Sequence, residues 1–118
     1  FDYLASRHSW AAEREFSRSI EAKPTPFALA GRAWARLNLK KNDEAEADSI
    51  RAVALERNEA TLRARGDVAW ARDDMKTARL YWLAAYRSGW RGEDMEKTFA
   101  LVGITDPEKE AKVTLPTP

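Results

Sequence analysis

Apolar side chains recur along this chain at the spacing that places them on one face of a helix. Two such runs lie between residues 27 and 58, and a polar segment, residues 41–44, separates them. Two amphipathic helices joined by a short polar segment are typical of a helical hairpin. The apolar positions are Phe27, Ala30, Trp34 and Leu37 in the first run and Ala47, Ile50, Ala54 and Leu55 in the second.

The polar segment has the residue types of a helix boundary. Asparagine tolerates a turn conformation, and we expect Asp43 to cap the second helix of the hairpin. The same order recurs over residues 61–89, where Asp73 and Asp74 stand at the turn and Gly89 follows the second helix as a C-cap glycine would. The pattern therefore predicts a second hairpin.

The start of the chain carries a weaker version of this pattern. We expect Tyr3 and Leu4 to end a leading helix, Arg7 and His8 to form a turn, and the prolines of residues 23–26 to terminate a trailing helix. The opening residues thus resemble the second half of a hairpin, and we expect the chain to be a fragment of a longer array.

The end of the chain is also less regular. After the second hairpin, the pattern predicts a short helix over residues 93–102 and another that begins at Asp106 and Pro107, which suit the N-cap and the first turn. We expect residues 113–118 to form a linker or a disordered tail.

Three stretches of the chain, residues 12–24, 47–59 and 78–90, resemble one another. Each begins with alanine, has a small residue seven positions later, and has a large apolar residue directly after that. The leading alanines, Ala12, Ala47 and Ala78, lie 35 and 31 residues apart, close to the period of about 34 residues of helix-turn-helix repeats. We therefore divide one domain, residues 1–112, into repeats, namely a partial repeat 1–26, repeats 27–58 and 59–90, and degenerate short helices 91–112.

This pattern resembles the tetratricopeptide repeat. The residues that carry the resemblance are Trp34, Ala35, Leu39, Asn42, Asp43, Ala47 and Ala54 in one unit and Gly66, Trp70, Asp73, Asp74, Ala78, Trp82 and Ala85 in the next. The resemblance implies an all-α fold, a tetratricopeptide-like α-solenoid of antiparallel helical hairpins. Alanines such as Ala47, Ala54, Ala78 and Ala85 would face large side chains where helices cross. Arg51 and Arg65 depart from the usual residue types.

A narrower resemblance concerns the tryptophan- and arginine-rich repeats and the string YWLAAYRSGW, residues 81–90. They are similar to the periplasmic repeat scaffolds of bacterial outer-membrane exopolysaccharide export proteins. This resemblance implies a periplasmic protein-protein interaction scaffold that recruits a polysaccharide-modifying enzyme and helps to guide polymer to an outer-membrane barrel. A carbohydrate-binding repeat surface and a cytoplasmic peptide-binding or chaperone adaptor are the alternatives.

Composition narrows these choices only slightly. The chain has 118 residues, a formal net charge of +1 and no cysteine. Its length suits one domain, and its charge is too small to indicate nucleic acid or a membrane surface as partner. The absence of cysteine excludes a disulfide scaffold and is compatible with cytosol or periplasm. No apolar run reaches the length of a transmembrane helix.

In the tetratricopeptide family the first helix of each hairpin lines a concave groove, and the matching positions here are the candidate partner-binding residues. They are Arg32, Arg36, Leu39, Lys40, Arg63, Asp67 and Trp70, with Leu29, Ala71 and Lys97 at further groove positions. Independently of the family, Arg32, Arg36 and Lys40 recur every four residues, so three like charges share one helical face. An acidic partner, or neighbouring acids such as Asp67, would compensate them; a solvated basic face is the alternative.

Five tryptophans raise the question of carbohydrate binding, because aromatic faces stack on sugar rings. We expect Trp10, Trp34 and Trp82 to be buried, since they occupy apolar-stripe positions. Trp70 is expected to point toward the groove, and Trp90 to pack against the helix that follows it.

The remaining polar residues predict no catalytic site, metal or cofactor. The acid pairs Asp43-Glu44, Asp73-Asp74 and Glu93-Asp94 open predicted helices, where carboxylates satisfy free N–H groups. His8 has no second ligand at a metal-binding spacing. We therefore expect a non-enzymatic scaffold whose partner is another protein or a polysaccharide, with end-to-end self-association of exposed repeat ends.

Overall fold

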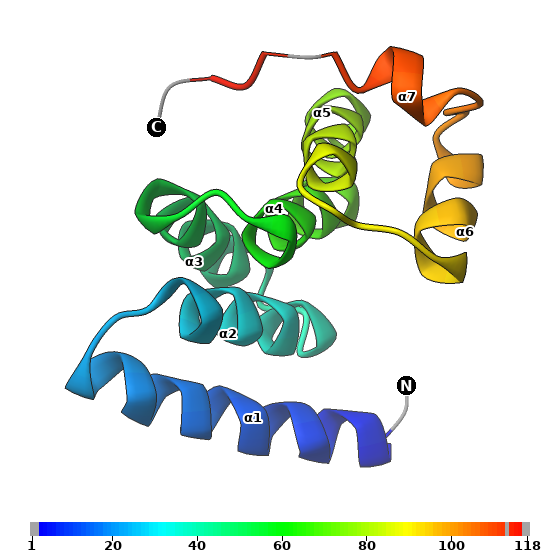
Figure 1. Cartoon of the computed structure of the whole chain (residues 1–118). Coiled ribbons are helices and arrows are strands. Elements are labelled where there is room, and N and C mark those ends of the chain that lie inside the picture. The colour runs from blue at the N-terminus through cyan, green and yellow to red at the C-terminus, as the bar shows by residue number, and fades with distance from the viewer. Residues whose placement is uncertain (1–2, 113, 117–118) are drawn as a thin grey trace.

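The computed structural model describes the backbone of residues 3–112 and 114–116 and, within that range, the side chains from residue 7 onward (Figure 1). The described residues form helices and no strand. The helices are α1 (Tyr3–Ala22), α2 (Pro26–Asn38), α3 (Asn42–Leu55), α4 (Glu59–Ala71), α5 (Met75–Arg87), α6 (Glu93–Leu101) and α7 (Pro107–Glu110).

Successive helices pack against one another in antiparallel pairs, which confirms the all-α prediction (Figure 1). α1 packs on α2, α2 on both α3 and α4, α3 on α4, and α4 on α5. α6 reaches this stack through large side chains: the rings of Tyr86 and Trp90 lie 6.0 and 5.5 Å from the ring of Phe99. Trp90 is buried there, as the sequence predicted.

The two hairpins, α2–α3 and α4–α5, repeat at a constant interval, which we define as the sequence separation between Lys40 and Asp73. These two residues lie in the turn after the first helix of each hairpin, with φ values of 63° and 60°. Thr25 and Asn58 have the same separation, and they cap α2 and α4 by accepting hydrogen bonds from backbone N–H groups. Because caps and turns coincide in both hairpins, this repeat interval defines the repeat better than the unequal spacings in the sequence.

The buried alanines of α3 are Ala45 and Ala52, and the expected pair, Ala47 and Ala54, is exposed. Ala45 and Ala52 lie one repeat before Ala78 and Ala85, which are also buried, and one repeat after Ala12 and Ser19. The register expected from the sequence was therefore wrong by two residues in this helix.

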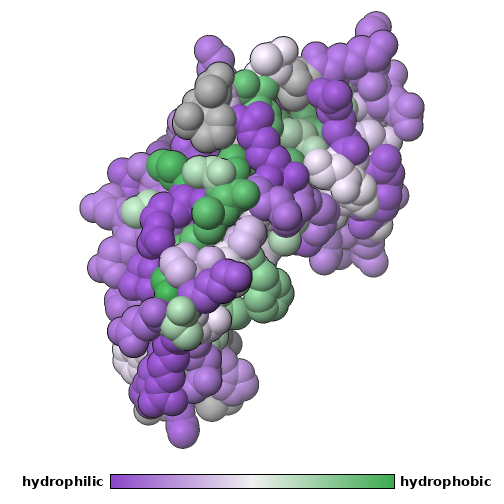
Figure 2. Space-filling model, turned by 60° about the vertical axis from the view of Figure 1, so that its left-hand side comes forward, coloured by the Kyte–Doolittle hydropathy of each residue, from purple (hydrophilic) through white to green (hydrophobic). Residues whose placement is uncertain are grey.

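The cause of the register error lies in the composition of α3. Its buried face carries Asp48 and Ser49 beside the alanines, whereas its apolar residues Ile50 and Leu55 are exposed. Periodicity assigns the apolar stripe to the core, but here the core side contains a carboxylate that ion pairs compensate. The left side of Figure 1, where α3 lies, comes forward in Figure 2, and apolar surface gathers there among hydrophilic side chains.

The expected turn at Arg7 and His8 is also wrong, because α1 continues through it as one helix. Arg7 lies one repeat before Lys40, so the turn would have matched the register. Residues 3–22 contain no glycine or proline, so no residue interrupts the helical hydrogen bonds at this point. The side chains of Tyr3 and Leu4 lie outside the described residues.

Other helix boundaries agree with the sequence predictions except at α3. Asp74 caps α5 by accepting from Thr77 N at 3.1 Å, and Asp106 caps α7 in the same way. Gly89 follows α5 with a φ of 117°, a value that favours glycine. α3 begins at Asn42 without a side-chain cap, and Asp43 instead forms an ion pair with Arg72, the residue that follows α4.

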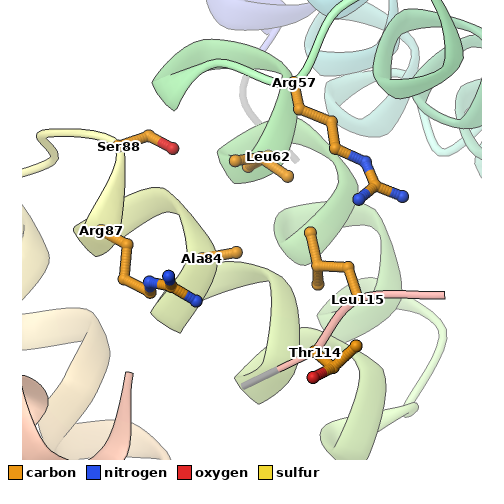
Figure 3. A pocket seen from close by; sticks show the side chains of 7 residues that line it. All are labelled: Arg57, Leu62, Ala84, Arg87, Ser88, Thr114 and Leu115. Atoms are coloured by element: carbon orange, nitrogen blue, oxygen red, sulfur yellow. The ribbon is translucent and has the colours of Figure 1, made fainter. Parts of the chain in front are cut away.

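Residues 114–116 have no helix, yet they lie on α4 and α5 (Figure 3). Leu115 packs against the core beside Leu62 and Ala84, and the carbonyl oxygen of Pro116 accepts a hydrogen bond from Arg57. A pocket of about 450 Å³ remains around these residues. The described part of the predicted tail is therefore held against the domain.

Candidate binding face

Asp67 on α4 joins three helices through its two carboxylate oxygens. The indole N–H of Trp34, from α2, donates to Oδ2 at 2.7 Å, and that of Trp82, from α5, donates to Oδ1 at 2.9 Å. Each carboxylate oxygen thus accepts one hydrogen bond from an uncharged indole N–H group. This arrangement links the first hairpin, α2–α3, to the second, α4–α5.

Gly66 explains why Trp82 can reach Asp67. A Cβ atom at position 66 would lie 2.5 Å from Cδ1 of Trp82, closer than real Cβ atoms approach. The absence of a side chain lets the indole lie directly against the backbone of α4. The residue before Asp67 therefore creates the space for its hydrogen-bond donor.

The electrostatic surroundings of Asp67 are only partly favourable to its charge. Burial raises the pKa of its carboxyl above the usual aspartate value, although the two indole hydrogen bonds and the nearby charge of Arg63 oppose this effect. Arg63 donates to Glu59 at 3.2 Å, while its guanidinium lies 4.6 Å from the ring of Trp90. Its Nε atom is buried and has no hydrogen-bond partner.

Trp70 completes this side of α4. Its ring lies 5.7 Å from that of Trp82, and 38% of the residue is exposed. Arg63, Asp67 and Trp70 follow one another at intervals of four and three residues, so they share one face of the helix. We call these three residues together with Trp34 the α2–α4 face.

Arg32 and Arg36 lie in a different cluster, between α2, α3 and α1. Arg32 donates two hydrogen bonds to Asp48, at 2.8 and 2.7 Å, and Arg36 donates to Asp48 at 2.9 Å and to Glu13 at 2.9 Å. Asp48 is only 2% exposed. Residues 32 and 36 point about 200° away from Trp34 around the helix axis. Asp48 and Glu13, rather than Asp67, therefore neutralise these arginines.

Glu13 also accepts a hydrogen bond from Lys41 at 3.0 Å. Burial alone would raise its pKa, but the hydrogen bonds and charges of Arg36 and Lys41 outweigh that effect and hold the pKa of Glu13 below its usual value. The pKa values of Glu13 and Asp67 are therefore shifted in opposite directions.

The remaining groove candidates are dispersed. Leu39 is half-buried as the C-cap residue of α2, and Lys40 is exposed in the turn. Leu29 is fully buried in the core, and Lys97 pairs with Glu93 on the surface of α6. The structure thus brings together Arg63, Asp67 and Trp70 from the predicted set and separates them from Arg32 and Arg36.

The tryptophans divide in a way that the sequence predicted only in part. Trp82 is buried as expected and Trp34 is partly buried, but Trp10 is 50% exposed and that prediction was wrong. Trp10 lies one repeat before Asp43, which is also exposed, so its register position faces outward.

Sequence reasoning missed Asp48 and Glu13 and the role of Trp34 as a hydrogen-bond donor. The available signal for Asp48 was its spacing, because it lies three residues after Ala45 and four before Ala52 on the buried side of α3. Two arginines one turn apart on the preceding helix also require a nearby acid. The repeat interval seen in the structure would have identified that position.

The described residues contain no group of three or more histidine, cysteine, aspartate or glutamate side chains that could hold a metal ion. Within the same residues, no helix combines the length and apolar character needed to cross a bilayer. Comparison with family models, with curated proteins and with solved structures gives no match. The geometry thus defines a class only, an all-α domain of adjacent antiparallel helical hairpins.

Proposed function

We propose that this chain is a protein-protein interaction scaffold whose α2–α4 face binds a segment of a partner protein. The observation that carries the proposal is the half-exposed Trp70, whose ring rests on Trp82 beside Arg63. Tryptophan and arginine are the residue types that contribute most to protein interfaces. Because Trp82 and Asp67 are fixed by hydrogen bonds, Trp70 is supported in position before any partner arrives.

The constant repeat supports a tetratricopeptide-like α-solenoid as the architecture of this scaffold. Equivalent caps, turns and buried alanines recur at one interval in both hairpins, at Thr25 and Asn58, Lys40 and Asp73, and Ala45 and Ala78. In such arrays each unit buries its apolar side against its neighbours, and the stacked helices present an extended surface.

For the biological setting, the proposal rests on the sequence resemblance alone. It places the scaffold in the periplasm, within an outer-membrane exopolysaccharide export protein, with a polysaccharide-modifying enzyme as partner. Co-purification of such an enzyme with the wild-type chain, and its loss with Trp70→Ala, would support this setting. If the Trp70→Ala variant still co-purified with the enzyme, the enzyme would not bind at the α2–α4 face.

Peptide selection tests the binding proposal directly. A displayed library of short random peptides is selected on the wild-type protein, and the enriched peptides are titrated by fluorescence. We expect Trp70→Ala to weaken binding about tenfold or more, as for a central interface tryptophan. The matched control is Trp10→Ala, a tryptophan of similar exposure on α1, which should leave the affinity unchanged.

The same titration distinguishes a protein partner from a carbohydrate, the alternative ligand of this face. The partner would be a polysaccharide if no peptide were enriched and soluble oligosaccharides produced a saturable shift of tryptophan fluorescence. Trp70→Ala should then abolish this shift. Equal loss of peptide binding in Trp70→Ala and Trp10→Ala would contradict the assignment of the α2–α4 face.

A further inference from the structure

The groove between α3 and α4 is filled by α2. Ala33 of α2 forms a fully buried cluster with Ala45 of α3 and Val68 of α4, and Leu37 packs against it. One turn away, Ala30 of α2 is buried in the cluster that contains Ala52 and Ala64. A helix with a stripe of small residues is thus the natural occupant of this groove.

The same groove recurs one repeat earlier, between α1 and α2. Ala12, Gly31 and Ala35 lie one repeat before Ala45, Ala64 and Val68, and all three line an open groove of about 440 Å³. No described helix fills it. At its edge Phe27 is 73% exposed.

The side chains in the groove favour an apolar occupant. The ring of Phe16 lies across Gly31, where a Cβ atom would be 2.3 Å from its Cζ, and Phe27 meets Phe16 edge to face at 6.0 Å. Trp34 forms one wall, and its indole is fixed by the hydrogen bond to Asp67. Aromatic rings therefore form the floor and one wall of the groove, and small residues line much of the rest.

We propose that the α1–α2 groove binds an amphipathic helix of a partner protein, placed on α1 and α2 as α2 is placed on α3 and α4. The groove residues of α2 extend from Phe27 to Asn38, a length of about 16 Å, which corresponds to three helical turns. The partner helix presents alanine or glycine opposite the Phe16 ring, because this ring already occupies space that Ser49 leaves free in the next repeat. This site shares only Trp34 with the α2–α4 face, and Trp70 does not line it.

The partner is argued from the continuity of an interface already present in the molecule. In the α3–α4 groove, Ala45, Ser49, Ala64 and Val68 are completely buried under α2. A helix in the α1–α2 groove would repeat that burial and cover Phe27, the most exposed large apolar residue of those described. An extended peptide or a sugar would leave the repeated small-residue contacts unmade.

A stapled, fluorescent peptide with the sequence of α2, residues 26–38, is the probe, because α2 is the helix that fills the equivalent groove. We expect saturable binding in a fluorescence-polarisation titration and no binding of the same peptide with Ala33→Glu. In the protein, Phe27→Glu should raise the dissociation constant about tenfold or more. The matched control Leu55→Glu changes an equally apolar, 54% exposed residue outside the groove and should have no effect.

Circular dichroism checks that each variant is folded, and Ala12→Glu serves as the second groove variant if Phe27→Glu does not fold. Trp70→Ala should leave the binding of this peptide unchanged, so failure of this proposal and failure of the proposed function remain distinguishable. The proposal is overturned if the peptide does not bind, or if Leu55→Glu weakens binding as much as Phe27→Glu.

Two other occupants would also overturn it. Self-association in light scattering that Phe27→Glu abolishes would assign the groove to a second copy of the chain. An oligosaccharide that shifts tryptophan fluorescence in the wild type and in Leu55→Glu, but not in Phe27→Glu or Ala12→Glu, would assign it to a sugar.

Discussion

Asp48 and Asp67 are both enclosed by side chains from neighbouring helices, but they are satisfied by different chemistry. Asp48 accepts hydrogen bonds from two guanidinium groups, Arg32 and Arg36, so its charge is balanced within the cluster. Asp67 accepts from two neutral indoles, Trp34 and Trp82. The first cluster depends on charge, whereas the second depends on the positions of aromatic rings, and only the second borders an exposed tryptophan.

Removal of Asp48 should have the largest effect on stability. Asp48→Ala leaves Arg32 and Arg36 mostly buried with too few acceptors, which costs about 3–5 kcal/mol for a broken buried ion pair. Chemical denaturation measures the loss. The control Asp43→Ala removes an exposed carboxylate that pairs with Arg72 and should cost no more than about 1 kcal/mol. Similar losses in both variants would contradict the structural role of the Asp48 cluster.

Removal of Asp67 should cost less. Asp67→Ala leaves two indole N–H groups without an acceptor, a loss of about 1–3 kcal/mol, but it also removes a carboxylate whose charge is disfavoured by burial. The measurement is the same denaturation series. A loss larger than that of Asp48→Ala would show that the indole cluster, and not the ion cluster, dominates the stability of the hairpin stack.

The sequence predicted where the helices begin and end better than which residues pack between them. Most helix ends follow from local residues such as Pro24, Asp74 and Gly89, whose effects on the backbone do not depend on distant contacts. The register of α3 could not be obtained in this way. Its core side contains Asp48, and a buried carboxylate looks like a surface position until the two arginines that face it are placed in space.

The candidate site was predicted in part for the same reason. Arg63, Asp67 and Trp70 lie together because helical spacing alone places them on one face of α4. The partners that give this face its geometry, Trp34 and Trp82, come from other helices. They could be placed only after the packing of the two hairpins was known.

The pH dependence of stability should also distinguish the two clusters, although its effect should be smaller than that of removing Asp48 or Asp67. The pKa of Glu13 is lowered in the folded protein, so Glu13 stabilises the fold above the usual glutamate range near 4.3 and this contribution is lost as the pH falls through its folded pKa. The pKa of Asp67 is raised, so its contribution has the opposite sign and stability falls as the pH rises from about 3.9 through its folded pKa.

Denaturation of the wild type, Glu13→Gln and Asp67→Asn across the acid range measures these contributions. Glu13→Gln should reduce the acid-induced loss of stability, and Asp67→Asn should increase the slope with which stability rises with pH. The interpretation fails if both variants change the slope in the same direction.

The constant repeat interval is the central claim, because it relates the two hairpins, the two grooves and the buried alanines. Thermal and chemical denaturation of Ala52→Leu and Ala54→Leu tests it most directly, since the two alanines lie on the same helix and only Ala52 is buried. We predict that Ala52→Leu overpacks the interface at a cost of about 1–3 kcal/mol and that Ala54→Leu changes stability by less than about 0.5 kcal/mol. A loss confined to Ala54→Leu would contradict the register.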